Sequence, residues 1–91
     1  MRLSEEIDLV KEIIKEKKCM FVEYDAPSGY LITAKRKGSN QAQDLAETIE
    51  ERLKDKGIEC VKFTTQRWGY INIISGSLTV VINPCLEEDQ P

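Results

Sequence analysis

The chain has 91 residues, of which 41% are hydrophobic and 32% are charged, and its formal net charge is −3. Such a composition predicts one folded domain and argues against wholesale disorder. The negative net charge disfavours a general nucleic-acid binder, and the apolar runs are too short to cross a membrane. The N-terminus does not have the pattern of a signal peptide, so we expect the protein in the cytoplasm.

The cysteines and the missing histidine limit the chemistry that the sequence can support. Cys19, Cys60 and Cys85 are too few and too scattered for a disulfide framework, and no two are spaced as metal ligands are. We therefore expect no metal and no cofactor, and we interpret Cys19 and Cys60 as small buried hydrophobes. Because there is no histidine, a catalytic dyad or triad built on imidazole is excluded.

The first helix is predicted to begin after Ser4, a plausible N-cap, with Glu5 and Glu6 at the positive end of the helix dipole. We interpret the lysines at its other end as a solvated helix terminus, with an anion-binding patch as the alternative: Lys15, Lys17 and Lys18. Residues at helical spacing form the stripe that we expect to be buried: Leu3, Ile7, Val10 and Ile14, with Ile13 beside them.

A β-hairpin is predicted over residues 19–34. The first strand has a period of two, which places three residues on one side: Met20, Val22 and Tyr24. Residues 25–29 include aspartate, proline and glycine, which favour a turn, and residues 30–34 resume as a strand.

A long helix is predicted from about Asn40 to Lys56. Asn40 with Gln43 fits a capping box, Ser39 is an almost equally good cap, and Gly57 stands where a left-handed C-cap residue is expected. The apolar stripe of this helix has spacings of three and four: Ala42, Leu45, Ala46, Ile49 and Leu53.

Three further strands are predicted at residues 60–65, 70–74 and 78–83, and Pro84 ends the last because it has no N–H group. The order is α-β-β-α-β-β-β, an α+β fold of two helices on a mixed five-stranded sheet. We assign residues 1–85 to this single α/β domain. Residues 86–91 are expected to be an acidic disordered tail.

Two features suggest binding of an anion or of a partner. Lys35, Arg36 and Lys37 lead into Gly38 and the free N–H groups of a helix N-terminus, which can hold a phosphate. Basic residues beside a strand are also ordinary solubility devices. We interpret Trp68, in a predicted turn, as a lid on the core, with presentation to a partner as the alternative.

A Gly-Ser pair at a helix start, as at Gly38-Ser39, also occurs in nucleotidyltransferases, where it holds the nucleotide phosphates. Those enzymes need two acidic residues on the following strand to bind Mg²⁺. The corresponding segment here has Glu59 but no second carboxylate two positions on. We therefore expect no enzymatic activity.

The order and spacing of these motifs resemble the ribosomal silencing factor family, also called Iojap-like proteins, from the first helix to about Pro84. The family's Gly/Ser segment, with a glutamine that opens the long helix, matches Gly38-Ser39-Asn40-Gln41. Its later Gly-x-Trp element aligns with Trp68-Gly69-Tyr70, and its valine-rich strand aligns with residues 76–82. The chain departs from the family at four positions: Tyr70 for Trp, Ile74 and Ser77 for Asp, and Val81 for His.

The resemblance implies a nucleotidyltransferase-like fold without catalysis, which binds the large-subunit ribosomal protein L14 and hinders subunit joining. It places the partner surface at Ser39, Gln41, Trp68 and Tyr70. One alternative is a small RNA- or phosphate-binding module that uses Lys35, Arg36, Lys37 and Gly38. Another is a homodimer joined through sheet edges or the Tyr70 strand, with an unrelated regulatory role.

Overall fold

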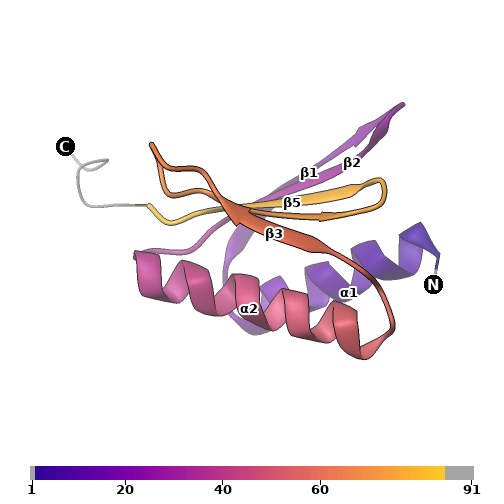
Figure 1. Cartoon of the computed structure of the whole chain (residues 1–91), viewed down its shortest axis with the longest axis horizontal. Helices are drawn as coiled ribbons and strands as arrows, with labels where there is room; N and C mark the ends of the chain where they lie inside the picture. Colours follow the sequence, from indigo (N-terminus) through magenta and orange to yellow (C-terminus); the bar gives the residue numbers. More distant parts are fainter. Residues whose placement is uncertain (1, 86–91) are drawn as a thin grey trace.

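The computed structural model describes residues 2–85, in which two helices pack on one face of a five-stranded sheet (Figure 1). This confirms the predicted fold class and element order; the predicted tail, residues 86–91, lies outside the described residues. The elements are α1 (Leu3–Glu16), β1 (Met20–Ala26), β2 (Gly29–Lys35), α2 (Ser39–Asp55), β3 (Val61–Thr64), β4 (Ile71–Ser75) and β5 (Leu78–Asn83).

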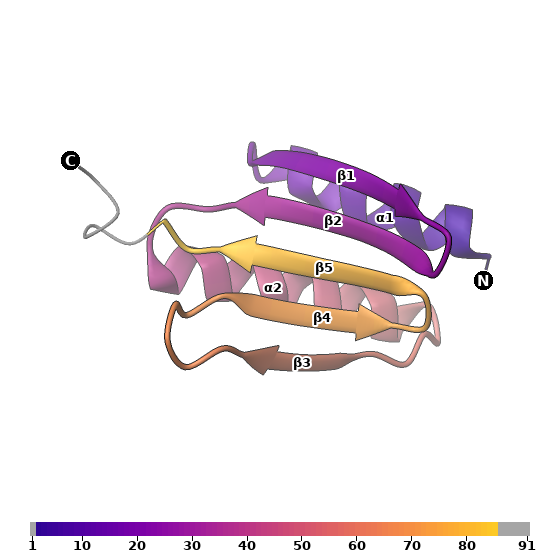
Figure 2. The ribbon, with the colours of Figure 1, turned by 90° about the horizontal axis from the view of Figure 1, so that it is seen from above.

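The strands lie in the order β1-β2-β5-β4-β3 (Figure 2). The neighbouring strands β2 and β5 are parallel, whereas the other neighbouring strands are antiparallel. The chain leaves β2, crosses beneath the sheet as α2, and returns from the far edge through β3 and β4 to β5. This route makes the sheet mixed and brings the two halves of the sequence together at its centre.

Each helix buries one apolar stripe against the sheet. The predicted stripe of α2 is fully buried, whereas in α1 the core residues are Val10, Ile13 and Ile14 and the predicted Leu3 is 39% exposed. Full burial of such aliphatic side chains contributes about 1.5–3 kcal/mol each. Alternate strand residues complete the core: Ile32, Ala34, Ile71, Ile73, Leu78, Val80 and Ile82.

Both helices begin earlier than predicted. α1 starts at Leu3 after Arg2, and α2 starts at Ser39 after Gly38, with no side-chain cap on either helix. The predictions that Ser4, or Ser39 or Asn40, would be the N-cap are therefore wrong. The reason at α2 is that Gly38 has a φ of 90°, and its N–H donates to the carbonyl oxygen of Pro84, which fixes the start of the helix.

The two helices end in the same hydrogen-bonding motif, with a left-handed residue just past the C-cap. In α2 this residue is Gly57, with a φ of 77°, as predicted. Its N–H donates to the carbonyl oxygen of Lys54, and the N–H of Ile58 donates to the carbonyl oxygen of Leu53. In α1 the corresponding residue is Lys18, with a φ of 58°. A side chain at such a φ costs free energy that glycine avoids.

Candidate functional site

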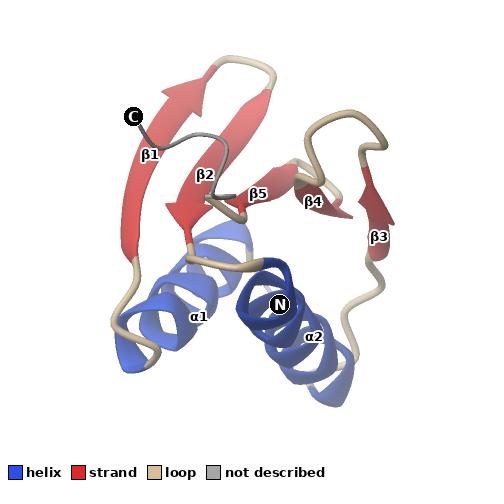
Figure 3. Ribbon diagram, turned by 90° about the vertical axis from the view of Figure 1, so that its left-hand side faces the viewer, coloured by secondary structure: helices blue, strands red, loops and turns tan. Residues whose placement is uncertain are grey.

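Both helices lie on one face of the sheet, and within residues 2–85 no helix covers the other face (Figure 3). The strand register decides which side chains lie on it, because successive residues of a strand point to opposite faces. One row across the sheet is Val22, Thr33, Val81, Asn72 and Phe63, and the next is Tyr24, Leu31, Thr79, Ile74 and Val61. We call these two rows, together with the partial row Met20, Lys35 and Asn83, the open face.

The open face is largely apolar, and of its residues only Lys35 is charged. Met20 is 79% exposed and Val61 is 64% exposed. Scattered exposed hydrophobic residues are ordinary, whereas a contiguous apolar patch marks an interaction surface. The open face is a contiguous apolar patch, because its apolar side chains come from all five strands.

The aromatic rings of the open face lie on its outer strands, with Tyr24 on β1 and Phe63 on β3. The three inner strands present small polar and aliphatic side chains: Leu31, Thr33, Thr79, Val81, Asn72 and Ile74. Sheets that bind single-stranded RNA present aromatic rings on which bases stack, beside several cationic groups. The open face has two aromatic rings, both on its outer strands, and one cationic residue, Lys35, so it is better suited to a protein surface.

Trp68 is 51% exposed, so the prediction that it forms a lid on the core is wrong. It lies in the β3–β4 loop, which closes on itself: the N–H of Thr65 donates to the carbonyl oxygen of Tyr70 at 2.8 Å, and the N–H of Tyr70 donates to Thr65 Oγ1 at 3.1 Å. The guanidinium carbon of Arg67 lies 5.0 Å from the centre of the indole ring. Trp68 is thus presented to solvent with a cation over one face of its ring.

The four predicted partner residues lie at one end of the sheet but on two different elements (Figure 2). Ser39 and Gln41 are exposed in the first turn of α2, whereas Trp68 and the half-buried Tyr70 belong to the β3–β4 loop. Pro84 links the two elements. Its carbonyl oxygen accepts the N–H of Gly38 at 2.6 Å, and its Cγ lies 3.8 Å from where a Cβ on Gly69 would stand.

A basic cavity of about 420 Å³ lies where the end of α1 meets the end of β2 and the start of α2. Its lining includes the three basic residues of the predicted anion site, though not Gly38, and a fourth cation, Lys18, for which a solvated helix end is the sequence-based prediction. The pairing of Met20 with Lys35 brings these segments together. We call it the basic cavity, and it is lined by Lys18, Cys19, Met20, Lys35, Arg36, Lys37, Gln41 and Cys85.

Arg36 ties the basic cavity to the end of α1. Its Nη1 donates to the carbonyl oxygen of Lys17 and lies 3.5 Å from Cys19 Sγ. Its Nε is buried and has no hydrogen-bond partner among residues 2–85. The guanidinium therefore has a fixed position and an unused donor.

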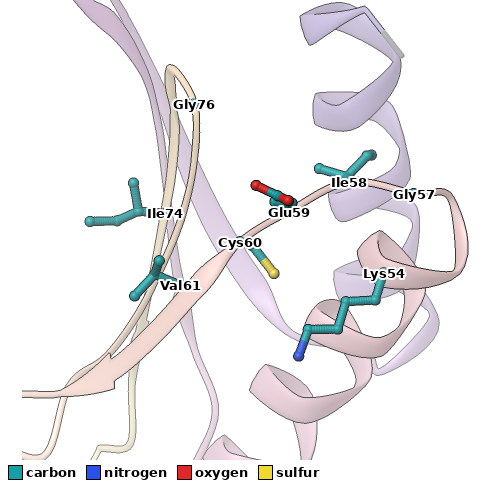
Figure 4. Close-up of a pocket in the computed structure, with 8 residues that line it drawn as sticks. All are labelled: Lys54, Gly57, Ile58, Glu59, Cys60, Val61, Ile74 and Gly76. Carbon is teal, nitrogen blue, oxygen red and sulfur yellow. The ribbon is translucent and has the colours of Figure 1, made fainter.

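A larger cavity, of about 670 Å³, lies at the opposite end of α2 (Figure 4). It is lined by Lys54, Gly57, Ile58, Glu59, Cys60, Val61, Ile74 and Gly76. Figure 4 shows the sulfur of Cys60 on the side of the strand that faces α2. Burial raises the pKa of the Cys60 thiol, and the Glu50 carboxylate adds to this effect. The thiol therefore stays protonated near neutral pH and is a poor nucleophile.

The expectation of two buried cysteines needs correction, because Cys19 and Cys60 are only half-buried. Glu59, the carboxylate considered for a nucleotidyltransferase metal site, lies beyond the far end of α2 from Gly38-Ser39. A helix of 17 residues is about 25 Å long. Glu59 is thus remote from a phosphate bound at the start of that helix.

Within the part of the chain that the structure describes, no group of three or more Asp, Glu or Cys side chains is arranged to hold a metal ion. In the same residues, no helix is long and apolar enough to span a membrane.

Several solved structures have a similar fold, and two of them are compared with this chain. Protein CV0518 from Chromobacterium violaceum has a TM-score of 0.79 and 21% identity, over 91% of this chain and 75% of that chain. A structural genomics target from Bacillus halodurans has a TM-score of 0.76 and 16% identity, over 88% of this chain and 81% of that chain. At these identities the similarity concerns the fold alone. No family model matches the sequence, and neither does any curated protein.

Proposed function

We propose that the chain is a non-enzymatic factor that docks on a large-subunit ribosomal protein of the L14 type and hinders subunit joining. The observation that carries this proposal is the open face, an exposed and nearly uncharged surface that extends across all five strands. The partner class comes from the resemblance of the sequence motifs to the ribosomal silencing factor family.

The chemistry of the open face favours a protein partner over a phosphate backbone. Nucleic-acid affinity comes largely from several cationic groups that neutralise phosphates. The open face offers only Lys35 for this purpose, whereas Val22, Val61 and Phe63 offer apolar area. Desolvation of that area on an apolar patch of the partner is the main source of affinity that this surface can supply.

The size of the open face favours reversible docking over a permanent dimer. Five strands about 4.8 Å apart make a surface roughly 20 Å wide. Permanent interfaces bury about 2,000 Å² or more in total, and this surface is too small to supply half of that. Trp68, at one end of the same sheet, adds a rigid aromatic side chain of the kind that anchors interfaces.

The proposal is tested by co-sedimentation of the full chain with isolated large and small ribosomal subunits at two salt concentrations. We expect association with the large subunit alone and little loss at the higher salt concentration, because apolar contacts are not screened. Addition of the protein to separated subunits should also slow their joining, measured by light scattering. Failure to bind the large subunit, or binding that is lost steeply with salt, would count against docking through the open face.

Sedimentation equilibrium of the purified chain distinguishes the homodimer alternative from docking on another protein. Val61 lies on the edge strand β3, so if this edge joins two copies of the chain, Val61→Glu should convert a dimer to a monomer. A wild-type chain that is already a monomer at the concentrations used for co-sedimentation supports docking on another protein.

A further inference from the structure

The basic cavity gathers four cationic residues at one place: Lys18, Lys35, Arg36 and Lys37. Within residues 2–85, no carboxylate lies within ion-pair distance of Lys18, Lys35 or Lys37. Five cations elsewhere are paired: Lys11 with Glu23, Lys17 with Asp44, Arg52 with Glu16, and Lys54 and Lys62 with Glu50. Within residues 2–85, four further cations also have no ion pair but do not line this cavity: Arg2, Lys15, Lys56 and Arg67. Like charges gathered without partners destabilise a fold, and a bound anion would relieve their repulsion.

Lys18 occupies a backbone position that favours glycine. The N–H of Lys18 donates to the carbonyl oxygen of Lys15, and the N–H of Cys19 donates to the carbonyl oxygen of Ile14. The same pair of hydrogen bonds ends α2 at Gly57. The chain uses glycine at the second helix end and lysine at the first, where φ is 58°. The Lys18 side chain therefore imposes a conformational cost at a position where it also lines the basic cavity.

The cavity also has donors suited to an oxyanion. Arg36 lines the cavity and is held in place by its hydrogen bond to the carbonyl oxygen of Lys17. Gln41, which lines the same cavity, lies in the first turn of α2, and that turn contains no acidic residue. Free N–H groups at a helix start add partial positive charge to the four cationic side chains of the lining.

We propose that the basic cavity binds a phosphate group, carried either by a nucleoside phosphate or by RNA. Its volume of about 420 Å³ lies within the roughly 300–1,000 Å³ of typical ligand pockets. Cys19, Met20 and Cys85 give it an apolar wall against which a base or a ribose can pack. The cavity shares Met20 and Lys35 with the open face, so its test uses the purified full chain without ribosomes.

Binding is measured by amide chemical shifts in titrations with inorganic phosphate, with ADP and with a short single-stranded RNA. We expect saturable shifts at residues of the basic cavity. ADP binding that is tighter than phosphate binding identifies a nucleotide as the source of the phosphate. RNA binding that is tightest, and that weakens steeply with salt, identifies RNA.

Two variants separate the site from general charge effects. Lys35→Gln with Lys37→Gln should weaken binding of the preferred probe by about tenfold or more. The matched control, Lys54→Gln with Lys56→Gln, removes the same charge at the other end of α2 and should leave affinity unchanged. Equal losses in both double variants, or no saturable binding of any probe, would overturn the proposal.

Lys18→Gly tests the site against a purely structural role, because its two effects have opposite signs. Glycine should raise the denaturation midpoint by relieving the left-handed backbone, and the loss of the ammonium group should weaken phosphate binding several-fold. A Lys18→Gly chain that is more stable and binds the probes as tightly as wild type would overturn the role of Lys18 in the site.

Discussion

Val61 on β3 lies directly opposite Ile74 on β4, and both side chains are on the sheet face that no helix covers. Val61 is 64% exposed and Ile74 is 38% exposed, although both are aliphatic. A cross-strand pair contributes only about 0.2–1 kcal/mol to stability. The pair therefore adds little to the folded monomer, and its apolar surface is free to contribute to binding.

Leu45→Ala and Ile49→Ala should each lower the free energy of unfolding by about 2–5 kcal/mol, because both side chains are fully buried between α2 and the sheet. Val61→Ala should cost well under half as much, since the side chain is mostly in water. Urea denaturation of the three variants gives the comparison. Similar losses at Val61 and Leu45 would contradict the assignment of the two faces of the sheet.

Gly29→Ala should destabilise the protein more than Gly57→Ala. A Cβ on Gly29 would stand 2.6 Å from the carbonyl oxygen of Ser77, which accepts the N–H of Tyr30, so the contact between β2 and the β4–β5 turn must shift. Gly57 has open space around it, and its substitution by alanine costs only the left-handed backbone, roughly 1–2 kcal/mol. Thermal unfolding midpoints of both variants test this order.

Tyr30 should titrate at unusually high pH. Its hydroxyl donates a hydrogen bond to Glu23, which raises the pKa of Tyr30 to about 12 and, with the Lys11 ammonium, lowers the pKa of Glu23. Glu23→Gln should therefore bring the Tyr30 pKa down toward its ordinary value of 10.0, as measured by near-ultraviolet absorbance. Asp25→Asn, a conservative change nearby on β1, is the control and should have a much smaller effect.

The hydrogen-bonded pair of Tyr30 and Glu23 makes a contribution to stability that is lost at both low and high pH. The pKa of Glu23 is lowered by folding, so its contribution is present above the pKa of the unfolded carboxyl and is lost as pH falls through the folded value. The pKa of Tyr30 is raised, so its contribution is complete below pH 10.0 and is lost as pH rises to about 12. Near neutral pH, where both contributions are complete, they add no slope to the stability curve.

The buried faces of the helices could be predicted because a period of 3.6 residues leaves one stripe to bury, as Leu45 and Ile49 show. The strands could be found in the same way from their period of two. That period groups Val61 with Phe63, but it does not say which side of the sheet the helices cover. The answer depends on pairing with β4 and on the position of α2, both of which are long-range.

The basic cavity could be predicted only in part, for a similar reason. Lys35, Arg36 and Lys37 are adjacent in sequence, whereas Lys18 joins them because β1 pairs with β2. The sequence favours Trp68 as a lid on the core, because a large aromatic side chain in a turn either folds back onto the core or is presented to a partner. Its exposure follows from the hydrogen bonds between Thr65 and Tyr70, which close the loop before the ring can reach the core.

Trp68→Ala should weaken binding to the large ribosomal subunit by about tenfold, near 1.4 kcal/mol, if the exposed indole is an interface anchor. The variant should keep its unfolding midpoint within a few degrees, because the loop is closed by backbone and Thr65 contacts that the indole does not make. Wild-type affinity in a folded variant would remove Trp68 from the docking surface. Trp68→Phe, which keeps an aromatic ring, should restore part of the binding.

The central claim, that the open face docks on the large subunit, is tested most directly by dissociation constants for that subunit. Val22→Glu and Val61→Glu place a carboxylate on the open face at positions that are 54% and 64% exposed, so both chains should remain folded. Gln43→Glu adds the same charge at an exposed position of α2, on the other side of the molecule, and is the matched control. We predict that each valine variant weakens binding by about tenfold or more and that the control binds as wild type does. Wild-type affinity in both valine variants, or an equal loss in Gln43→Glu, would contradict the account.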